Sequence, residues 1–303
     1  MDLRQLNAFL AVVDHGGFTA AARATHTVQS NISTHVARLE RELATTLIDR
    51  ATGRLTEEGD AVVARARRIQ AELAALEADV SALQGAPRGT VRCGIIGTTA
   101  RWLTPHLVQE LGAEAPQLHL IVADGTTTSL VLRLLDGELD LAVVGTPVED
   151  SEIRTVPLFD EDYVLVAPDD HPLVKLEVAT VADLAQHELL LAAPRTPIRR
   201  ELDDAFAAAG VRVKPKVEID GLRLLASLAF AGFGAAIVPA SAAPSWVGGS
   251  WTRIPVEGLP RRRVGLATRR RGMPSMAAQA VQGSIRHILA TRGPQVGGLH
   301  VAA

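Results

Sequence analysis

The sequence predicts an α/β protein in three parts: an N-terminal all-α winged helix-turn-helix, a long coiled-coil linker helix, and a two-lobed α/β domain. Three observations lead to this fold class. Apolar residues recur at helical spacing through residues 1–56, one heptad pattern fills residues 57–84, and apolar runs alternate with amphipathic helices from residue 90. We therefore expect domains at 1–58, 59–89 and 90–303, with lobe I at about 90–161 and 267–292 and lobe II at about 162–266.

Composition favours a folded chain that is not a polycation. Of the 303 residues, 47% are hydrophobic, which is enough to bury several cores. The formal net charge is −3, so the chain cannot bind nucleic acid or membranes through bulk positive charge. Any contact with DNA must come from a few placed side chains.

Targeting and redox features favour a cytoplasmic location. Met1–Gln5 lacks the basic and then apolar pattern of a signal peptide, and no apolar run approaches the ~18 residues of a membrane-spanning helix. Cys93 is the only cysteine, so no intrachain disulfide forms. Its place inside an apolar run favours a small core residue over a thiol sensor. The nine histidines are scattered, so we expect neither a metal site nor a cofactor.

The N-terminal part begins with two short helices. Apolar residues recur at helical spacing from Leu3 to Val13, and His15-Gly16-Gly17 ends this helix. A second helix is expected at Ala20–Ala24, with Thr19 as its N-cap.

A third helix is predicted from Gln29 to Leu43, and its other face is polar. Its inward residues are Ile32, Val36, Leu39 and Leu43. Two short helices joined by a tight turn, the second with a hydrogen-bonding outer face, are typical of a helix-turn-helix. On pattern alone, a small helical bundle whose polar face only meets water is about equally favoured.

A wing after the third helix shifts the balance toward DNA binding. Leu47–Thr56 reads as a strand, a turn with glycine and a second strand, and a wing commonly sets an arginine in the minor groove. The expected DNA-contacting residues are Gln29, Ser30, Asn31, Ser33, Thr34, His35, Arg38, Arg50 and Arg54.

The linker pattern is the most regular in the sequence. Its apolar residues alternate spacings of four and three: Val62, Ala66, Ile69, Leu73, Leu76, Val80 and Leu83. A stripe this narrow over a helix of ~40 Å indicates a helix–helix seam, so we expect self-dimerisation. The alternative is that the helix packs against the chain's own domains.

The C-terminal part alternates strands and helices. For lobe I we predict parallel strands at Val91–Ile96, Leu118–Asp124 and Leu141–Val144, with helices around Trp102–Leu111 and Ser129–Leu135. Lobe II is expected to hold strands at Tyr163–Ala167, Leu189–Ala192, Pro215–Ile219 and Ala235–Val238, with helices at Pro197–Ala209 and Leu222–Ala231. Val264–Thr268 and a helix at Ser275–Leu289 return to lobe I. Two arginine triplets, Arg261–Arg263 and Arg269–Arg271, are interpreted as solvated faces or contacts between subunits.

Hydroxyl residues follow several strands, where ligands of such sheets bind. Hydroxyls beside exposed backbone N–H groups suit a small organic anion, and an arginine from lobe II could supply a cation. The expected ligand-binding residues are Thr98, Thr99, Thr126, Thr127, Thr128, Thr146, Arg195 and Thr196. For each threonine taken alone, simple N-capping of a helix is the commoner role.

Several spaced motifs together resemble the LysR-type transcriptional regulators. They are Gly17-Phe18-Thr19-x-Ala21-Ala22, Gln29-Ser30-Asn31-Ile32-Ser33, Arg38-Leu39-Glu40, Leu47-x-x-Arg50 and Leu55-Thr56-x-x-Gly59. The sequence departs from the family pattern at Val28, where a Ser or Thr cap is usual, so Thr27 is expected to cap one residue earlier. Ser30 replaces a frequent proline, and the wing is about two residues short.

The resemblance covers the whole chain and implies what each part does. It implies promoter DNA as a partner, a small-molecule effector bound in a hinged cleft like that of periplasmic binding proteins, and a dimer that commonly pairs into a tetramer. The family's peroxide-sensing members use a cysteine pair, which is absent from this chain. RNA polymerase is a further candidate partner.

Two other functional classes compete with a regulator. A secreted solute-binding protein would explain two lobes, but it would explain neither the first 84 residues nor the missing signal peptide. An enzyme on the same scaffold would need a catalytic triad, an acid–base pair or a Gly-rich nucleotide loop, and none is evident at the strand ends.

Overall fold

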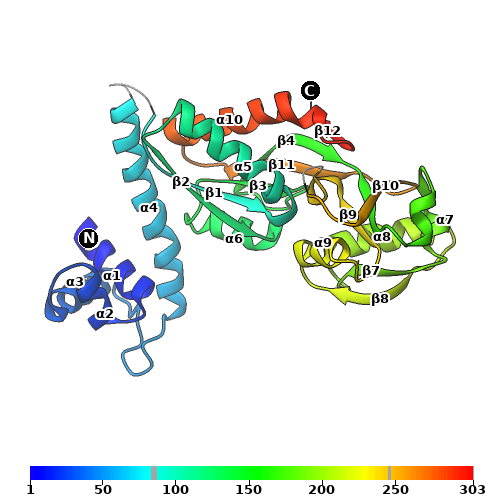
Figure 1. The fold of residues 1–303 in the computed structure, drawn as a ribbon. Coiled ribbons are helices and arrows are strands. Elements are labelled where there is room, and N and C mark those ends of the chain that lie inside the picture. Colours follow the sequence, from blue (N-terminus) through cyan, green and yellow to red (C-terminus); the bar gives the residue numbers. More distant parts are fainter. Residues whose placement is uncertain (83–86, 245–246, 303) are drawn as a thin grey trace.

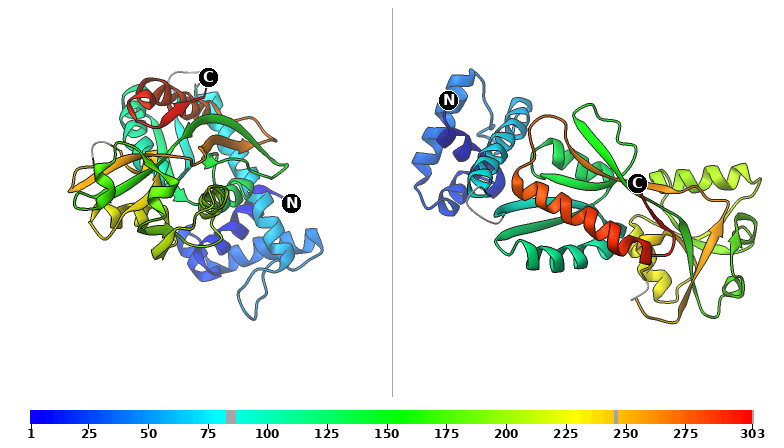
Figure 2. Two further views of the ribbon diagram at one scale, coloured as in Figure 1. Left: turned by 90° about the vertical axis from the view of Figure 1, so that its right-hand side faces the viewer. Right: turned by 90° about the horizontal axis from the view of Figure 1, so that it is seen from above.

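The computed structural model describes residues 1–82, 87–244 and 247–302. A small helical head lies at one end of a long helix, and the two lobes follow in a row beside that helix (Figure 1). Lobe II is the part farthest from the head, as the view from above also shows (Figure 2). The predicted three-part fold is confirmed.

The head is formed by α1 (Leu3–His15), α2 (Phe18–Ala24) and α3 (Gln29–Leu43) around an apolar core. The expected second helix was too short. Gly16 and Gly17 adopt φ values of 72° and 147°, which turn the chain sharply enough for α2 to begin at Phe18. Gly17 is therefore the N-cap, and Thr19 lies inside the helix.

The linker helix α4 runs from Glu57 to Ala82. Its start is fixed by Thr56, whose Oγ1 accepts a hydrogen bond from the Gly59 N–H at 3.0 Å. A methyl group built on Gly59 would lie 2.2 Å from the Leu47 carbonyl oxygen. Only glycine lets α4 pack this closely on the head, which explains the Leu55-Thr56-x-x-Gly59 motif.

Lobe I is a mixed six-stranded sheet with helices on both faces. Its strand order is β12 (Leu299–Val301), β4 (Ile153–Glu161), β11 (Arg262–Arg269), β3 (Leu141–Gly145), β1 (Gly89–Ile96) and β2 (Leu118–Gly125). The helices are α5 (Gly97–Glu114), α6 (Thr127–Leu135) and α10 (Met276–Arg292). The three predicted strands pair in parallel, but β4, β11 and β12 add an antiparallel half. The helices α5 and α10 lie on the face opposite α6 (Figure 1).

Lobe II is a second six-stranded sheet, with apolar clusters on both faces. Its strand order is β6 (Ala179–Thr180), β10 (Trp251–Glu257), β5 (Tyr163–Pro168), β9 (Ala236–Pro239), β7 (Glu188–Ala192) and β8 (Lys214–Ile219). Its helices are α7 (Val181–Leu184), α8 (Pro197–Ala208) and α9 (Leu222–Phe230). Short 3₁₀ turns occur at Pro172–Lys175 (η1) and Ala240–Ala242 (η2), and another, Gly293–Gln295 (η3), follows α10 in lobe I.

Two chain segments join the lobes. One is Asp162, between β4 and β5, and the other is 258–261, between β10 and β11. All of β11 pairs with β3 and β4, so the structure places the return to lobe I at Arg262 rather than at residue 267. The strand β12 extends lobe I beyond the expected end at residue 292.

Candidate functional site

The outer face of α3 carries most of the polar side chains that the sequence assigns to DNA contact. Five of them are exposed: Gln29, Ser30, Asn31, Thr34 and Arg38. One hydrogen bond from α2 and one to the turn before α3 hold this face in place. Thr19 Oγ1 donates to Gln29 Oε1 at 3.1 Å, and Asn31 Nδ2 donates to Thr27 Oγ1 at 3.0 Å. The start of α3 is thus held in place with a hydrogen-bonding surface turned outward.

Three details of α3 differ from the expectation. Val28 is the N-cap and no side chain caps the helix, because Thr27 accepts from Asn31 instead. Leu43 is 37% exposed at the end of the helix, so it is not part of the inward stripe. Ser33 and His35 are half-buried, and His35 Nδ1 is covered without a hydrogen-bond partner in the described part of the chain.

The wing is a tight loop with a single β-bridge, between Ile48 and Leu55. Asp49 organises it, since its carboxylate accepts from the Ala51 N–H at 2.9 Å and from Thr52 Oγ1 at 2.7 Å. The Thr52 hydroxyl, and then the Ala51 N–H, lower the pKa of Asp49. Arg54 is exposed beside this loop.

Glu40 connects the wing to α3, a role that only the family motif signalled. Its Oε1 accepts from the N–H groups of Leu47 at 2.9 Å and Ile48 at 3.3 Å. Its Oε2 lies 3.4 Å from Arg50 Nη2, and the Arg50 guanidinium lies 5.6 Å from the centre of the Phe18 ring. Arg50 is therefore partly held by the head, whereas Arg54 is free to meet DNA.

The seam of α4 divides into two portions. Ala66 is 1% exposed and, with the partly buried Val62, packs into the core of the head. The seam assignment of Ala66 is wrong, because its own head covers it. By contrast, Leu76 and Val80 are 60% and 51% exposed, and Ile69 and Leu73 are also exposed. Leu83 lies outside the described residues.

Charged side chains fix α4 to both of its neighbours. Arg67 pairs with Asp14 of α1 at 2.8 Å and also with Glu138 of lobe I. Arg68 donates to the Leu135 carbonyl at 2.7 Å and pairs with Glu152 at 3.1 Å. The linker therefore contacts the head and lobe I through consecutive arginines, which periodicity alone did not reveal.

The sheet register places the predicted lobe I threonines at one edge, after the parallel strands β1, β2 and β3, and several of their hydroxyls make contacts within the fold. Thr126 and Thr196 are N-caps of α6 and α8, and Thr127 Oγ1 accepts from the Gly145 N–H at 3.0 Å. Thr128 is exposed, and Thr146 precedes a cis peptide bond to Pro147. Arg195 is exposed with φ 71°, and no described contact joins it to the lobe I threonines.

Thr98 and Thr99 begin α5 in a buried junction between the lobes. Arg262 Nη1 donates to Thr98 Oγ1 at 2.9 Å and lies 3.3 Å from Glu161 Oε1, while the Ser241 N–H of lobe II donates to Glu161 Oε2 at 2.9 Å. Arg262 is therefore not part of a solvated face, so the interpretation of the first triplet is wrong for this residue, whereas Arg261 and Arg263 are exposed. Thr99 Oγ1 is buried and has no partner among the described residues.

The second triplet is likewise only partly solvated. Arg269 Nη1 donates to the carbonyl oxygens of Leu134 at 3.1 Å and Leu139 at 2.8 Å. Arg270 Nε donates to the Ser151 carbonyl at 3.1 Å. These contacts hold the end of β11 against neighbouring loops of lobe I.

Two arginines that the sequence did not predict as site residues lie near each other between the lobes. Arg223, on α9 of lobe II, pairs with Asp124 at the end of β2. Arg101, on α5 of lobe I, lies 3.4 Å from Ser227 Oγ and 5.4 Å from the centre of the Phe230 ring. Burial lowers the pKa of Arg101, and the positive charge of Arg223 lowers it further. Helical spacing was the available signal, because Gly97 and Arg101 share one face of α5.

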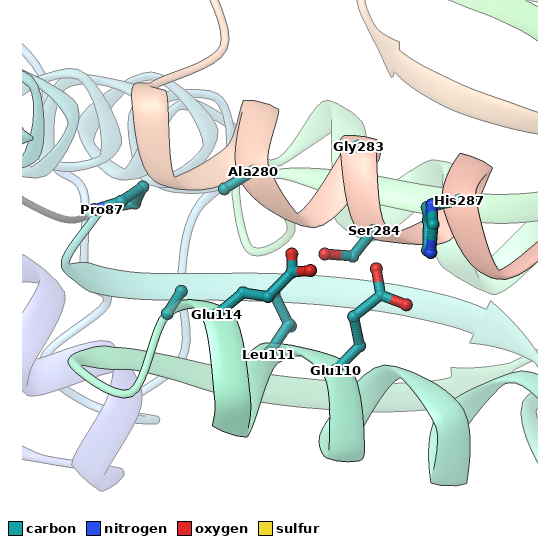
Figure 3. A pocket seen from close by; sticks show the side chains of 9 residues that line it. Pro87, Glu110, Leu111, Glu114, Ala280, Gly283, Ser284 and His287 are labelled. Carbon is teal, nitrogen blue, oxygen red and sulfur yellow. The ribbon is translucent and has the colours of Figure 1, made fainter.

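A separate groove of about 280 Å³ lies between α5 and α10. Glu110 and Glu114 point into it from α5, and Ser284 and His287 approach from α10 (Figure 3). None of the predicted ligand-binding residues lines this groove.

Cys93 is fully buried in β1, as expected for a core residue. Burial raises the pKa of its thiol to about 12, and the Asp140 carboxylate adds to the effect. The thiol is therefore protonated at neutral pH and is a poor nucleophile.

The described residues contain no group of three or more His, Cys, Asp or Glu side chains suited to hold a metal ion. Among the helices of the described ranges, none combines the length and apolar character needed to span a bilayer.

Comparison with known proteins identifies both parts of the chain. Residues 3–60 match the model of bacterial regulatory helix-turn-helix proteins of the lysR family, and residues 84–290 match the LysR substrate binding domain. A probable hydrogen peroxide-inducible genes activator of Mycobacterium leprae is 34% identical over 298 residues, covering 94% of each chain. The DNA-binding transcriptional dual regulator OxyR of Escherichia coli K12 is 29% identical and covers 80% of this chain and 81% of its own.

Solved structures agree with this result. A full-length OxyR variant from Pseudomonas aeruginosa superposes with a TM-score of 0.73 at 25% identity, covering 96% of this chain and 95% of that one. Full-length CbnR, in a complex with target DNA, gives a TM-score of 0.70 at 25% identity and covers 95% and 99%. The names of these relatives describe regulators of transcription. This chain belongs to the LysR family of bacterial regulatory helix-turn-helix proteins.

Proposed function

We propose that this regulator binds promoter DNA as a dimer of winged heads and responds to a small organic anion held between its two lobes. The observation that carries the DNA-binding part is the exposed polar face of α3, which hydrogen bonds with α2 and with the preceding turn hold in place. Short hydroxyl and amide side chains on such a face can read base edges in the major groove. The CbnR structure with target DNA supports this assignment.

The contacts divide by chemistry. Gln29, Ser30, Asn31 and Thr34 can read base edges, and the half-buried Ser33 and His35 lie behind them. Arg38 is suited to contact a phosphate. Arg50 is suited to the same contact, although its ion pair with Glu40 restricts where its guanidinium can reach. Arg54 extends from the wing toward the minor groove.

Dimerisation is supported by the exposed part of the linker seam. Four large apolar side chains, Ile69, Leu73, Leu76 and Val80, repeat at heptad spacing and are exposed on a helix that Arg67 and Arg68 fix to the head and to lobe I. Burial of a Leu or Ile side chain is worth about 1.5–3 kcal/mol, so leaving all of them in water is costly. A second copy of α4 is the partner with the matching stripe. Pairing of two such dimers into a tetramer remains part of the proposal.

The effector is proposed to be an anion that is sensed without redox chemistry. Several relatives carry names that refer to hydrogen peroxide. In this chain, however, the one cysteine is buried and protonated, so a peroxide-reactive thiolate is missing. Between the lobes, Asp124 pairs with Arg223, whereas Arg101 forms no ion pair among the described residues and lies near the uncapped N-terminus of α5. This environment favours a bound anion.

The test of the DNA-binding assignment is a comparison of α3 variants. Bound genomic sites are first mapped with the wild-type protein, and one site then serves as the probe in fluorescence anisotropy. Ser30→Ala with Asn31→Ala should reduce the preference for this site over random DNA by ~10-fold or more, because base contacts are worth about 1–3 kcal/mol each. Arg38→Ala should weaken binding to both DNAs equally. Arg200→Ala, an exposed arginine of lobe II, is the control. Unchanged preference in the α3 double variant would reject the assignment.

A further inference from the structure

A cationic pocket lies in lobe I, away from the junction between the lobes. It has a volume of about 180 Å³ and is covered by α10. Arg154 and Val156 of β4 line it, as do Leu266 and Thr268 of β11 and Arg270, which follows that strand. Alternate residues of a strand point to the same face, and Arg154 pairs with Thr268 in the sheet register, so these side chains share one surface.

The helix above the pocket contributes two more polar side chains. Gln282 and Arg286 are four residues apart on α10, so they project from one face of the helix onto the strands. Gln282 Nε2 is buried and has no hydrogen-bond partner among the described residues. A buried donor without an acceptor costs about 1–3 kcal/mol, which an acceptor inside the pocket would recover.

The arginines around the pocket have guanidinium N–H groups that are not used in hydrogen bonds among the described residues. Within the described ranges, neither Arg154 nor Arg286 forms a side-chain hydrogen bond or an ion pair, and Arg270 uses Nε and Nη2 on backbone carbonyls but not Nη1. The lining contains no aspartate or glutamate. Arg269 also borders the pocket, but its guanidinium is bound to carbonyls of the Leu134–Leu139 segment.

We infer that this pocket binds a small multivalent oxyanion of the phosphate class, held by Arg154, Arg270, Arg286 and Gln282. Several guanidinium groups around one cavity match the charge and the multiple acceptor oxygens of a phosphate group better than those of a monocarboxylate. The site is distinct from the Arg101–Arg223 pair, which lies between the lobes.

Its position relates the pocket to the linker helix. The loop after β11 contributes Gly272 and Pro274 to the lining. A methyl group built on Gly272 would lie 2.7 Å from Glu72 Oε1 of α4, and the Met276 N–H donates to Asp79 Oδ1 of α4 at 2.7 Å. An anion in the pocket would therefore bind beside the loop after β11, through which lobe I contacts α4.

The test is calorimetric titration of the full-length protein with inorganic phosphate, in chloride buffer at constant ionic strength. The double variant Arg154→Gln with Arg286→Gln should raise the Kd for phosphate at least ~10-fold, whereas Arg200→Gln should leave it unchanged. Gln282→Met should raise the Kd by a smaller factor, because it removes one neutral donor. The double variant should melt no lower than the wild type without phosphate, since it loses only unpaired charges. A parallel titration with glycerol phosphate distinguishes a phosphorylated metabolite from the free ion by which of the two binds more tightly.

Two results would overturn the inference. The first is phosphate binding that is equal in the double variant and the wild type. The second is the absence of phosphate binding by the wild type together with a loss of affinity for random DNA in the double variant. That second result would make the pocket a contact for the DNA backbone.

Discussion

The burial of a single cysteine supports the proposal that this chain does not sense peroxide through a thiol. Cys93 is fully buried, and the pKa of its thiol is raised to about 12 by burial and by Asp140. We predict that an alkylating reagent modifies Cys93 only after unfolding, and that hydrogen peroxide leaves the DNA footprint unchanged. Mass spectrometry of native and denatured protein measures the modification. Rapid alkylation of the folded protein would contradict the prediction.

Arg54 is the wing residue with the freedom to enter DNA. The structure holds Arg50 between Glu40 and Phe18 but leaves Arg54 exposed. Arg54→Ala is expected to weaken operator binding by ~1–3 kcal/mol, with a larger loss on A·T-rich flanks, where the narrow minor groove attracts arginine. Arg65→Ala, on the exposed side of α4, is a control for charge alone. Equal losses on A·T-rich and G·C-rich flanks would exclude minor-groove placement.

At this scale the sequence predicted residue types better than it predicted their partners. Glu40 and Gly59 appeared in the sequence only as members of family motifs. In the structure, Glu40 holds the wing by accepting from two N–H groups, and Gly59 lets α4 contact Leu47. Thr98 was predicted to contact an anion, and in the structure its hydroxyl accepts from Arg262, a partner far away in sequence that the prediction did not include. Such pairings depend on tertiary contacts, and local pattern does not contain them.

The helices and strands with a clear apolar pattern were the ones that the sequence predicted. The helices α3, α4 and α5 and the apolar strands β1, β3, β5 and β9 follow clear patterns and were found. The strands β4 and β10 were missed, because each contains a proline, Pro157 or Pro255, that argues against a strand. Pro157 lies next to a register shift opposite Val264 and Gly265, where the ladder tolerates the loss of an N–H.

Alanine substitutions at two helical glycines should change the stability of the protein in opposite directions. Gly59→Ala should destabilise the head by about 1–3 kcal/mol, because the new methyl group would overlap the Leu47 carbonyl. Gly112→Ala, in α5 with nothing within 4 Å of the added methyl, should stabilise the protein by about 0.5–1 kcal/mol through helix propensity. Urea unfolding of the two variants provides the comparison. Equal effects would show that the close packing of α4 on Leu47 is not maintained in solution.

The linker seam gives a prediction for assembly. Ile69→Glu with Leu73→Glu places charges in the exposed stripe and should produce monomers that no longer bind the operator. Gln70→Glu with Ala74→Glu adds the same number of charges at neighbouring exposed positions of α4 and is a matched control. Sedimentation velocity measures the oligomeric state. A soluble seam variant that sediments like the wild type would reject dimerisation through α4.

On the scale of the whole molecule, the head, linker and lobes are connected through a few charged contacts. Arg67 touches α1 and lobe I together, so a movement of lobe I relative to α4 must either carry the head with it or break one of these pairs. Lobe II reaches lobe I through Arg223 and through the Ser241 N–H bound to Glu161. Period and composition could place the three parts in order along the chain. They could not show which charges meet between the parts, since α5 and α9 come together only in the folded structure.

The final prediction distinguishes the ligand site that the sequence suggested from the one that the geometry supports. An anion shifts the balance between open and closed lobes only if it binds one state more tightly. Arg101 and Arg223 come from different lobes, so an anion that contacts both guanidinium groups, in competition with Asp124 for Arg223, would favour the closed state. Arg101→Gln and Arg223→Gln should each abolish the rise in melting temperature and the change in footprint that an active organic acid causes in the wild type, while operator affinity without the acid stays near the wild-type value. Arg195→Gln is the comparison, because Arg195 carries the same charge, is exposed, and forms no side-chain hydrogen bond or ion pair among the described residues. A panel of mono- and dicarboxylates identifies the active acid before the variants are compared. If Arg195→Gln alone loses the response, the effector lies at the N-terminus of α8, and the arginine pair between the lobes has only a structural role.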